Sequence, residues 1–133
     1  MILKSYEIKK IDTNKDCLVL FYGKNDGLKN EAIEILNRDK NNISSYEEKE
    51  ILDNENNFFE NILSKSFFEN KKFFIIKRVT DRFLKIVETL LLKNLDDTTI
   101  ILNSDNLEKK SKLRSFFEKN KKLVCVPFYP DNN

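Results

Sequence analysis

The sequence contains no histidine and no tryptophan, and only two glycines, two prolines and two cysteines among 133 residues. The absence of histidine excludes Ser-His and Cys-His nucleophile pairs and every metal site built on imidazole. Cys17 and Cys125 each lie in an apolar run, which predicts buried, reduced thiols. Their spacing matches no zinc motif. Histidine-assisted nucleophilic catalysis and zinc chemistry are therefore not expected.

Long hydrophobic runs and a strong charge of one sign are also missing. No stretch approaches the ~18 apolar residues of a membrane span, and residues 1–11 alternate charged and apolar side chains, unlike a signal peptide. The net charge is only +2, from 24 Lys and Arg against 22 Asp and Glu. A dedicated DNA-binding domain usually has a larger basic excess, because phosphate contacts dominate its affinity. We expect a cytoplasmic protein without membrane contact, whose contact with nucleic acid is weak or indirect.

Short apolar runs, which predict strands, alternate along the chain with amphipathic segments, which predict helices. The predicted strands are residues 17–23, 42–51, 73–77, 98–104 and 123–129. The predicted helices are residues 26–37, 54–65, 81–91 and 110–120. Asp26 and Asp81 are expected to cap the helices that they begin. This order predicts one α/β domain, a parallel sheet with helices on both faces.

The loop after the first predicted strand resembles a phosphate-binding loop but departs from it at two positions. Such a loop needs G-x-x-x-x-G-K-[ST], in which backbone N–H groups wrap the phosphates and the hydroxyl holds Mg²⁺. Counting from Gly23, the second glycine is replaced by Leu28, and Asn30 follows Lys29 where a hydroxyl should stand. The two glycines, Gly23 and Gly27, are better explained as turn residues. No bound nucleotide or other cofactor is expected.

The other strand ends also lack the residues of an ATPase. An acidic pair should end the third strand to hold Mg²⁺ and polarise water, but Lys77 and Arg78 stand there. A phospho-acceptor signalling domain would need acids at the ends of its first and third strands, and Tyr22 and Gly23 end the first. Asn103 ends the fourth strand and is interpreted as a strand-end cap. The sequence therefore predicts no catalytic and no metal-binding residues.

Two adjacent phenylalanines, Phe67 and Phe68, lie between a predicted helix and a predicted strand, among polar neighbours. Adjacent helical residues point ~100° apart, so both side chains cannot easily face one core. Exposed paired aromatics are costly unless a partner uses them. Packing of both rings under the sheet remains the alternative.

The predicted helix 110–120 is basic and amphipathic. Its side chains expected to face solvent are Lys110, Lys112 and Arg114, and those expected in the core are Leu113, Phe116 and Phe117. In the preceding helix the expected core residues are Phe83, Ile86, Val87, Leu90 and Leu91. The three cations either form a solvated face or contact phosphate or an acidic partner.

Three segments, taken together, resemble the delta subunit of the bacterial DNA polymerase III clamp loader. "LVLFYGKNDGLKNEAI" (18–33) is similar to the family's opening strand, glycine turn and acidic helix. "SFFENKKFFIIK" (66–77) is similar to its Ser-Leu-Phe-x-x-(Arg/Lys)-(Lys/Arg) segment before a strand. "LEKKSKLRSFFEKNKKLVCVPFYPDN" (107–132) is similar to its Lys-Lys-Ser-Lys-Leu-Arg helix and Cys-Tyr-x-Asp end. Phe67 and Phe128 depart from the usual Leu and Cys.

The resemblance implies an AAA+-like first domain without ATP hydrolysis, with strand order 5-1-4-3-2 and the strand predicted at residues 17–23 central. It implies that Phe67 and Phe68 are a wedge that enters a hydrophobic pocket on the sliding clamp and favours an open clamp during DNA replication. The implied partners are the clamp, other clamp-loader subunits and, indirectly, DNA. Residues 1–133 would be the first domain of the subunit, without its helical lid and collar. A degenerate nucleotide-binding domain and a nucleic-acid-binding domain remain alternatives.

Overall fold

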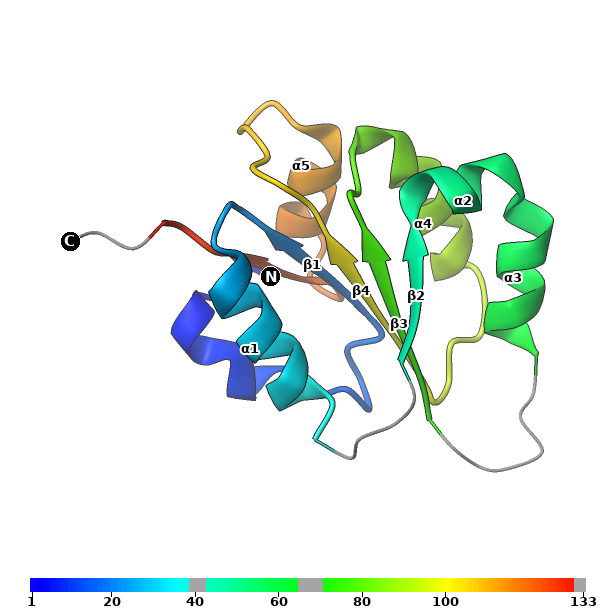
Figure 1. Ribbon diagram of the computed structural model, residues 1–133, viewed down its shortest axis with the longest axis horizontal. Coiled ribbons are helices and arrows are strands. Elements are labelled where there is room, and N and C mark those ends of the chain that lie inside the picture. Colours follow the sequence, from blue (N-terminus) through cyan, green and yellow to red (C-terminus); the bar gives the residue numbers. More distant parts are fainter. Residues whose placement is uncertain (39–42, 65–70, 131–133) are drawn as a thin grey trace.

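The structure is a computed structural model and describes residues 1–38, 43–64 and 71–130 (Figure 1). Its strands are β1 (Leu18–Tyr22), β2 (Ile43–Glu47), β3 (Lys72–Lys77), β4 (Thr98–Asn103) and β5 (Val124–Pro127). Its α-helices are α1 (Asp26–Leu36), α2 (Glu48–Asp53), α3 (Glu55–Leu63), α4 (Leu84–Leu91) and α5 (Lys112–Lys119). Two 3₁₀ helices, η1 (Ser5–Lys10) and η2 (Asp81–Phe83), complete the described elements.

All five strands are parallel and lie in the order β2-β3-β4-β1-β5, which confirms the predicted sheet and its order. The first strand is interior, flanked by β4 and β5, and β4 takes the middle position. Leu20 of β1 pairs with Cys125 of β5, so the strand that follows Cys17 neighbours the strand that holds Cys125, as expected. The run of apolar residues in each inner strand is explained by helices that cover both faces.

The alternation of side chains along β1 divides the core into two halves. Leu18, Leu20 and Tyr22 point to the face covered by α2, α3, α4 and α5. Val19 and Phe21 point to the opposite face, which η1 and α1 cover. Figure 1 shows α1 alone with η1 on one side of the sheet. The sheet therefore separates two hydrophobic cores, one on each face. The loops at the carboxyl ends of the strands are the usual place for a ligand site in such a fold.

The first residues of the chain lie along the outer edge of β5, which the sequence did not predict. Leu3 N–H donates to the Cys125 carbonyl at 2.9 Å, and Cys125 N–H donates to the Met1 carbonyl at 3.0 Å. The Met1 ammonium donates to the Leu123 carbonyl at 2.6 Å and the Asn120 carbonyl at 3.0 Å, just beyond α5. The edge of β5 is thereby paired with backbone.

Several predicted boundaries and caps were wrong. The strand expected over 42–51 ends at Glu47, and α2 follows directly, because Glu47 and Glu50 form a capping box there. Asn25, and not Asp26, caps α1: its Oδ1 accepts the Leu28 N–H at 3.1 Å. Thr80, and not Asp81, caps η2.

Two residues expected inside are partly exposed. Leu91 is the last residue of α4 and is 39% exposed. Cys17 lies just before β1 and is only partly buried, whereas Cys125 is fully buried. Burial raises the pKa of Cys125 to about 12, so this thiol stays protonated at neutral pH.

Candidate functional site

A shallow pocket of about 600 Å³ lies at the carboxyl ends of β1, β3 and β4, where a doubly wound sheet usually binds its ligand. Its lining residues are Asp26, Lys29, Asn30, Lys77, Arg78, Val79, Thr80, Asn103 and Asp105. This is the place where an ATPase of this fold would hold its nucleotide. The contacts of the lining residues decide whether this chain can do so.

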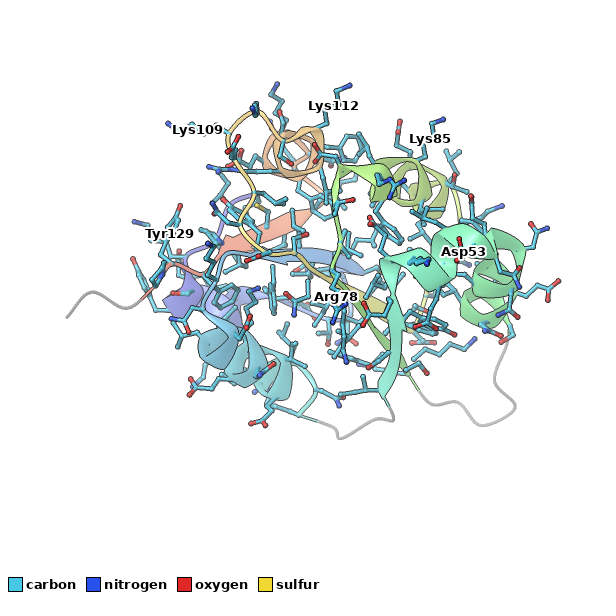
Figure 2. The ribbon with its side chains drawn as sticks, turned by 45° about the horizontal axis from the view of Figure 1, so that its top comes forward. Asp53, Arg78, Lys85, Lys109, Lys112 and Tyr129 are labelled. Atoms are coloured by element: carbon cyan, nitrogen blue, oxygen red, sulfur yellow. The ribbon has the colours of Figure 1, made fainter. Side chains whose placement is uncertain are left out.

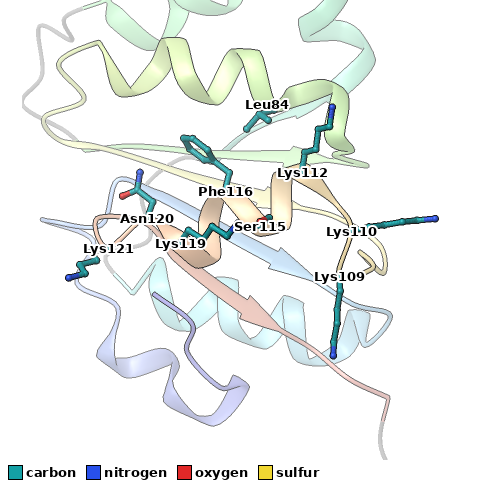
Figure 3. Close-up of a pocket in the computed structure, with 9 residues that line it drawn as sticks. All are labelled: Leu84, Lys109, Lys110, Lys112, Ser115, Phe116, Lys119, Asn120 and Lys121. Carbon is teal, nitrogen blue, oxygen red and sulfur yellow. The ribbon is translucent and has the colours of Figure 1, made fainter.

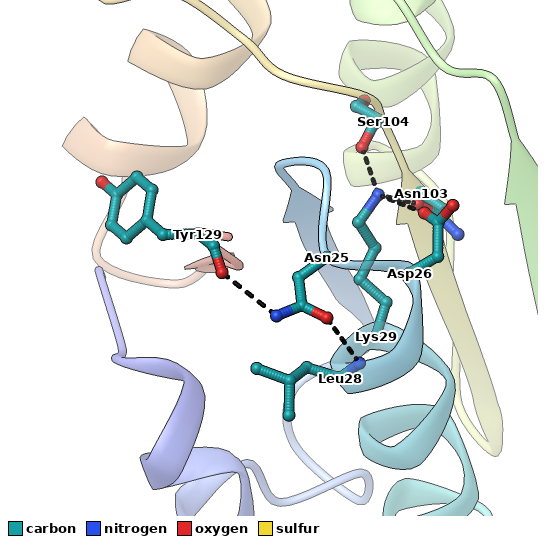
Figure 4. A network of polar contacts seen from close by, with 7 residues as sticks. All are labelled: Asn25, Asp26, Leu28, Lys29, Asn103, Ser104 and Tyr129. Carbon is teal, nitrogen blue, oxygen red and sulfur yellow. Dashed lines mark hydrogen bonds and ion pairs between the residues drawn. The ribbon is translucent and has the colours of Figure 1, made fainter. Parts of the chain in front are cut away.

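Lys29 is turned into the protein and is only 2% exposed (Figure 4). Its Nζ donates to Asn103 Oδ1 at 3.0 Å and to the Ser104 carbonyl at 2.9 Å, and it lies 3.5 Å from Asp26 Oδ1. Asn103, interpreted from the sequence as a strand-end cap, is therefore an acceptor for Lys29. These hydrogen bonds join α1 to the end of β4. In a functional phosphate loop the lysine ammonium would instead be free to bind the phosphates of the nucleotide.

Two backbone N–H groups of the loop are also paired within the protein. Gly23 N–H donates to the Asp105 carbonyl at 3.2 Å, and Asn25 N–H donates to the Phe128 carbonyl at 3.4 Å. The Asn25 side-chain amide donates in turn to the Tyr129 carbonyl at 3.1 Å (Figure 4). The segment after β5 thus lies across the loop, and these N–H groups point at carbonyls.

The two glycines of the loop play different parts. Gly23 has φ +115°, and a Cβ placed on it would lie 2.1 Å from the Phe128 carbonyl oxygen, so the close approach of the two backbones requires glycine. Gly27 was expected in a turn but lies in the first turn of α1. A Cβ there would meet only Asn25 Oδ1, at 3.7 Å.

The end of β3 is basic, as the sequence predicted. Arg78 is exposed with φ 56°, and its Nε lies 3.5 Å from Glu47 Oε2 (Figure 2). Glu48, the first residue of α2, is buried, and its carboxylate accepts the Thr80 N–H at 2.9 Å and the Thr80 hydroxyl at 2.9 Å. Residues 1–38, 43–64 and 71–130 contain no group of three side chains that could hold a metal ion.

Asp81 caps α5 from another part of the chain. Its carboxylate accepts the Ser111 hydroxyl at 2.6 Å and the Leu113 N–H at 3.1 Å. Ser111 Oγ accepts the Arg114 N–H at 3.2 Å, so the helix has two caps. The hydrogen bond from Ser111, with those from the backbone of Leu113 and Lys112, lowers the pKa of Asp81.

Arg114 was expected to face solvent, but its side chain is only 16% exposed. One guanidinium nitrogen donates to the Leu107 carbonyl at 2.8 Å, and Cζ lies 5.0 Å from the centroid of the Tyr22 ring. Its Nε lies 3.5 Å from Glu118 Oε2. The prediction was wrong because i,i+4 pairing with Glu118 and the ring of Tyr22 draw the guanidinium inward. Arg114 is thus a structural residue.

Lys110 and Lys112 are exposed, as predicted, and belong to an open groove of about 840 Å³ beside α5 (Figure 3). The groove is lined by Leu84, Lys109, Lys110, Lys112, Ser115, Phe116, Lys119, Asn120 and Lys121. Leu113 and Phe117 are buried, whereas Phe116, expected in the core, is only partly buried. Lys119 and Lys121 were not singled out in the sequence, although Lys119 lies seven residues after Lys112, a spacing that places both on one face of a helix.

Phe67 and Phe68 lie outside the described residues. The residues that flank their segment are held together: Lys72 Nζ donates to Ser64 Oγ at 3.1 Å, to the Ser64 carbonyl, and to the Ile62 carbonyl at 3.3 Å. These contacts join the start of β3 to the end of α3, because a cation there satisfies the last carbonyls of the helix.

No family model matches the sequence, and no curated protein is similar to it. The fold is similar to a solved structure, the Bacillus subtilis DNA clamp loader delta protein (YqeN), with a TM-score of 0.69 and 16% sequence identity. The match covers 96% of this chain and 42% of that protein, so this chain spans about two fifths of its neighbour. The likeness shows the fold, a parallel five-stranded α/β domain.

In the part of the chain that the structure describes, no helix is long and apolar enough to cross a membrane.

Proposed function

We propose that this chain is the first domain of a clamp-loader delta-type subunit, which binds the sliding clamp and helps to open it without hydrolysing ATP itself. The observation that carries the proposal is the pairing of the degenerate loop within the protein. Lys29 binds Asn103 and Ser104, and the N–H groups of Gly23 and Asn25 bind backbone carbonyls. An AAA+-like domain whose phosphate loop is used for packing suits a subunit that binds a protein partner and leaves ATP hydrolysis to neighbouring subunits. We propose that it acts in the cytoplasm.

The similarity in fold to a clamp loader delta protein supports the same proposal. So do the three sequence segments that resemble that family. We assign clamp binding to Phe67 and Phe68, since a pair of adjacent aromatics among polar neighbours suits an anchor that fills a pocket on a partner. Other clamp-loader subunits are the remaining proposed partners.

The test is clamp affinity and thermal stability measured on the same variants. Phe67→Ala/Phe68→Ala is expected to weaken binding of the cognate clamp at least ~30-fold, because loss of a central anchor costs ≥2 kcal/mol of binding. The melting temperature should change little. The matched control is Tyr6→Ala/Tyr129→Ala, which removes two aromatics that are 80% and 62% exposed and should leave binding unchanged.

The core alternative gives the opposite pattern. If both rings pack under the sheet, each removal should cost ~3–5 kcal/mol of stability, while the folded fraction still binds the clamp. That result would overturn the assignment of the wedge.

A further inference from the structure

The groove beside α5 combines positive charge with an apolar floor, and neither the fold nor the proposed clamp contact uses it. Lys112, Phe116 and Lys119 lie at positions i, i+4 and i+7 of α5, so they share one face of the helix. Leu84, the first residue of α4, faces Phe116 across the groove (Figure 3). The face therefore presents a cation, an apolar patch and a second cation along about 10 Å of helix.

The lysines of this groove have little negative charge to neutralise them. Among the described residues, no carboxylate lines the groove. Lys109, Lys112, Lys119 and Lys121 make no ion pair within the described part of the chain, and the pair formed by Lys110 Nζ with Glu108 is exposed and 3.4 Å long. Figure 2 shows Lys109 and Lys112 projecting outward on this side of the molecule. The charge complementarity calls for an acidic ligand.

The floor of the groove calls for an apolar group as well. Leu84 and Phe116 pack on the core from outside and remain partly exposed, between exposed lysines. An apolar side chain of a ligand would cover them and remove this surface from water. A bare polyanion would leave the patch uncovered, so charge alone does not account for the surface.

We propose that this groove binds a short acidic peptide segment of a partner protein, with the pattern acid-x-apolar-x-acid. In an extended peptide, residues i, i+2 and i+4 share a face and span about 13 Å. The apolar residue then lies on Leu84 and Phe116, and the two acids reach the flexible ammonium groups of Lys112 and Lys119. The site is separate from Phe67 and Phe68 and does not depend on the clamp contact.

A peptide fits better than nucleic acid for two reasons. The protein's net charge is only +2, so it lacks the extended positive field that phosphate binding requires. Glu108, exposed beside Lys110, would repel a phosphate backbone that continued along the loop before α5. A peptide needs only local charges and the apolar patch.

The experiment uses fluorescence anisotropy with a labelled peptide, Asp-Asp-Ser-Phe-Ser-Asp-Asp, and the full chain. Two variants with the same net charge are compared: Lys112→Gln/Lys119→Gln in the groove, and Lys9→Gln/Lys24→Gln at exposed sites elsewhere. The groove variant is expected to weaken binding at least about fivefold, and the control variant less than about twofold. Circular dichroism confirms that both variants are folded.

The apolar part of the site is tested with a second peptide, in which serine replaces phenylalanine. Its binding should be weaker by at least about fivefold at the same charge. Equal binding of the two peptides, equal effects of the two lysine variants, or no binding up to millimolar peptide would each overturn the proposal. Tighter binding of a labelled fifteen-nucleotide oligothymidine than of the phenylalanine peptide would overturn it in favour of nucleic acid.

Discussion

Gly23 lies where two backbones approach too closely for any side chain. Its φ is +115°, and a Cβ at this position would lie 2.1 Å from the Phe128 carbonyl oxygen, so Gly23→Ala must shift the segment after β5. We expect a loss of at least about 2 kcal/mol in the free energy of unfolding, from backbone strain together with the contact. Urea denaturation of the purified variant measures it.

Gly27→Ala is the matched control, since this glycine is helical and its Cβ would meet only Asn25 Oδ1 at 3.7 Å. Alanine is favoured over glycine inside a helix by up to about 1 kcal/mol, so the control should be neutral or stabilising. Equal losses in the two variants would contradict the different parts assigned to these glycines.

Lys29 offers a second test at the scale of the residue. Lys29→Ala removes an ammonium that binds Asn103 Oδ1 and the Ser104 carbonyl, and it leaves both acceptors without this donor. Hydrogen bonds to charged groups contribute about 1.5–3 kcal/mol each, and we expect a loss of at least about 2 kcal/mol in stability. Lys24→Ala, at an exposed position five residues earlier, should change it by less than about 0.5 kcal/mol. A small effect at Lys29 would mean that its ammonium is not bound as described.

Local sequence could predict some of these residues and not others. The missing glycine and hydroxyl at Leu28 and Asn30 are visible in the motif itself. The inward turn of the Lys29 and Arg114 side chains is not visible in the local sequence. Their partners, Asn103 on β4 and Tyr22 on β1, lie far from them along the chain. A charged residue in an amphipathic pattern is predicted to be exposed unless its partner is known.

At the scale of the element, α5 depends on a cap that comes from 30 residues away. Asp81 accepts hydrogen bonds from the Ser111 hydroxyl and from the N–H groups of Leu113 and Lys112. At pH 7, Asp81→Ala should reduce the free energy of unfolding by about 1 kcal/mol, the usual effect of losing an N-terminal cap. The sequence indicated a capping residue but assigned it to the nearest helix, since capping across the fold leaves no local signal.

The same cap predicts a dependence on pH. The hydrogen bonds lower the pKa of Asp81 in the folded state, so the unfolded chain binds the proton more tightly. The contribution of this group is therefore complete above its unfolded pKa of about 3.9 and is lost as pH falls through the lower folded value. The difference in free energy of unfolding between the wild-type protein and Asp81→Ala should therefore become smaller as the pH is lowered from 5 to 2.5, a range that brackets about pH 3.9. A difference that stays constant across this interval would contradict the role of the ionised carboxylate.

At the scale of the whole molecule, the parallel sheet and its two helical layers follow from apolar runs that alternate with amphipathic segments. The strand order was expected from the family resemblance and is present in the fold. The pairing of residues 1–3 with β5 was not foreseen, because this segment is short and forms only an isolated bridge at Ile2. Nor could local patterns show that residues 128 and 129 cross the loop after β1, because this contact joins segments that lie far apart in the sequence.

This crossing leads to the last prediction, which concerns nucleotide binding by the molecule as a whole. Leu28→Gly/Asn30→Ser restores the complete G-x-x-x-x-G-K-[ST] motif in sequence. The N–H groups of Gly23 and Asn25 would still face the carbonyls of Asp105 and Phe128, and Lys29 would still bind Asn103. We therefore expect neither the wild-type protein nor the variant to bind MgATP more tightly than about 1 mM, about −4 kcal/mol. Isothermal titration measures this, with circular dichroism to show that the variant is folded.

Saturable MgATP binding by the variant alone would mean that the altered motif, and not the packing of the chain across the loop, prevents nucleotide binding in the wild-type protein. Saturable binding by both proteins would contradict the proposal that the loop serves packing.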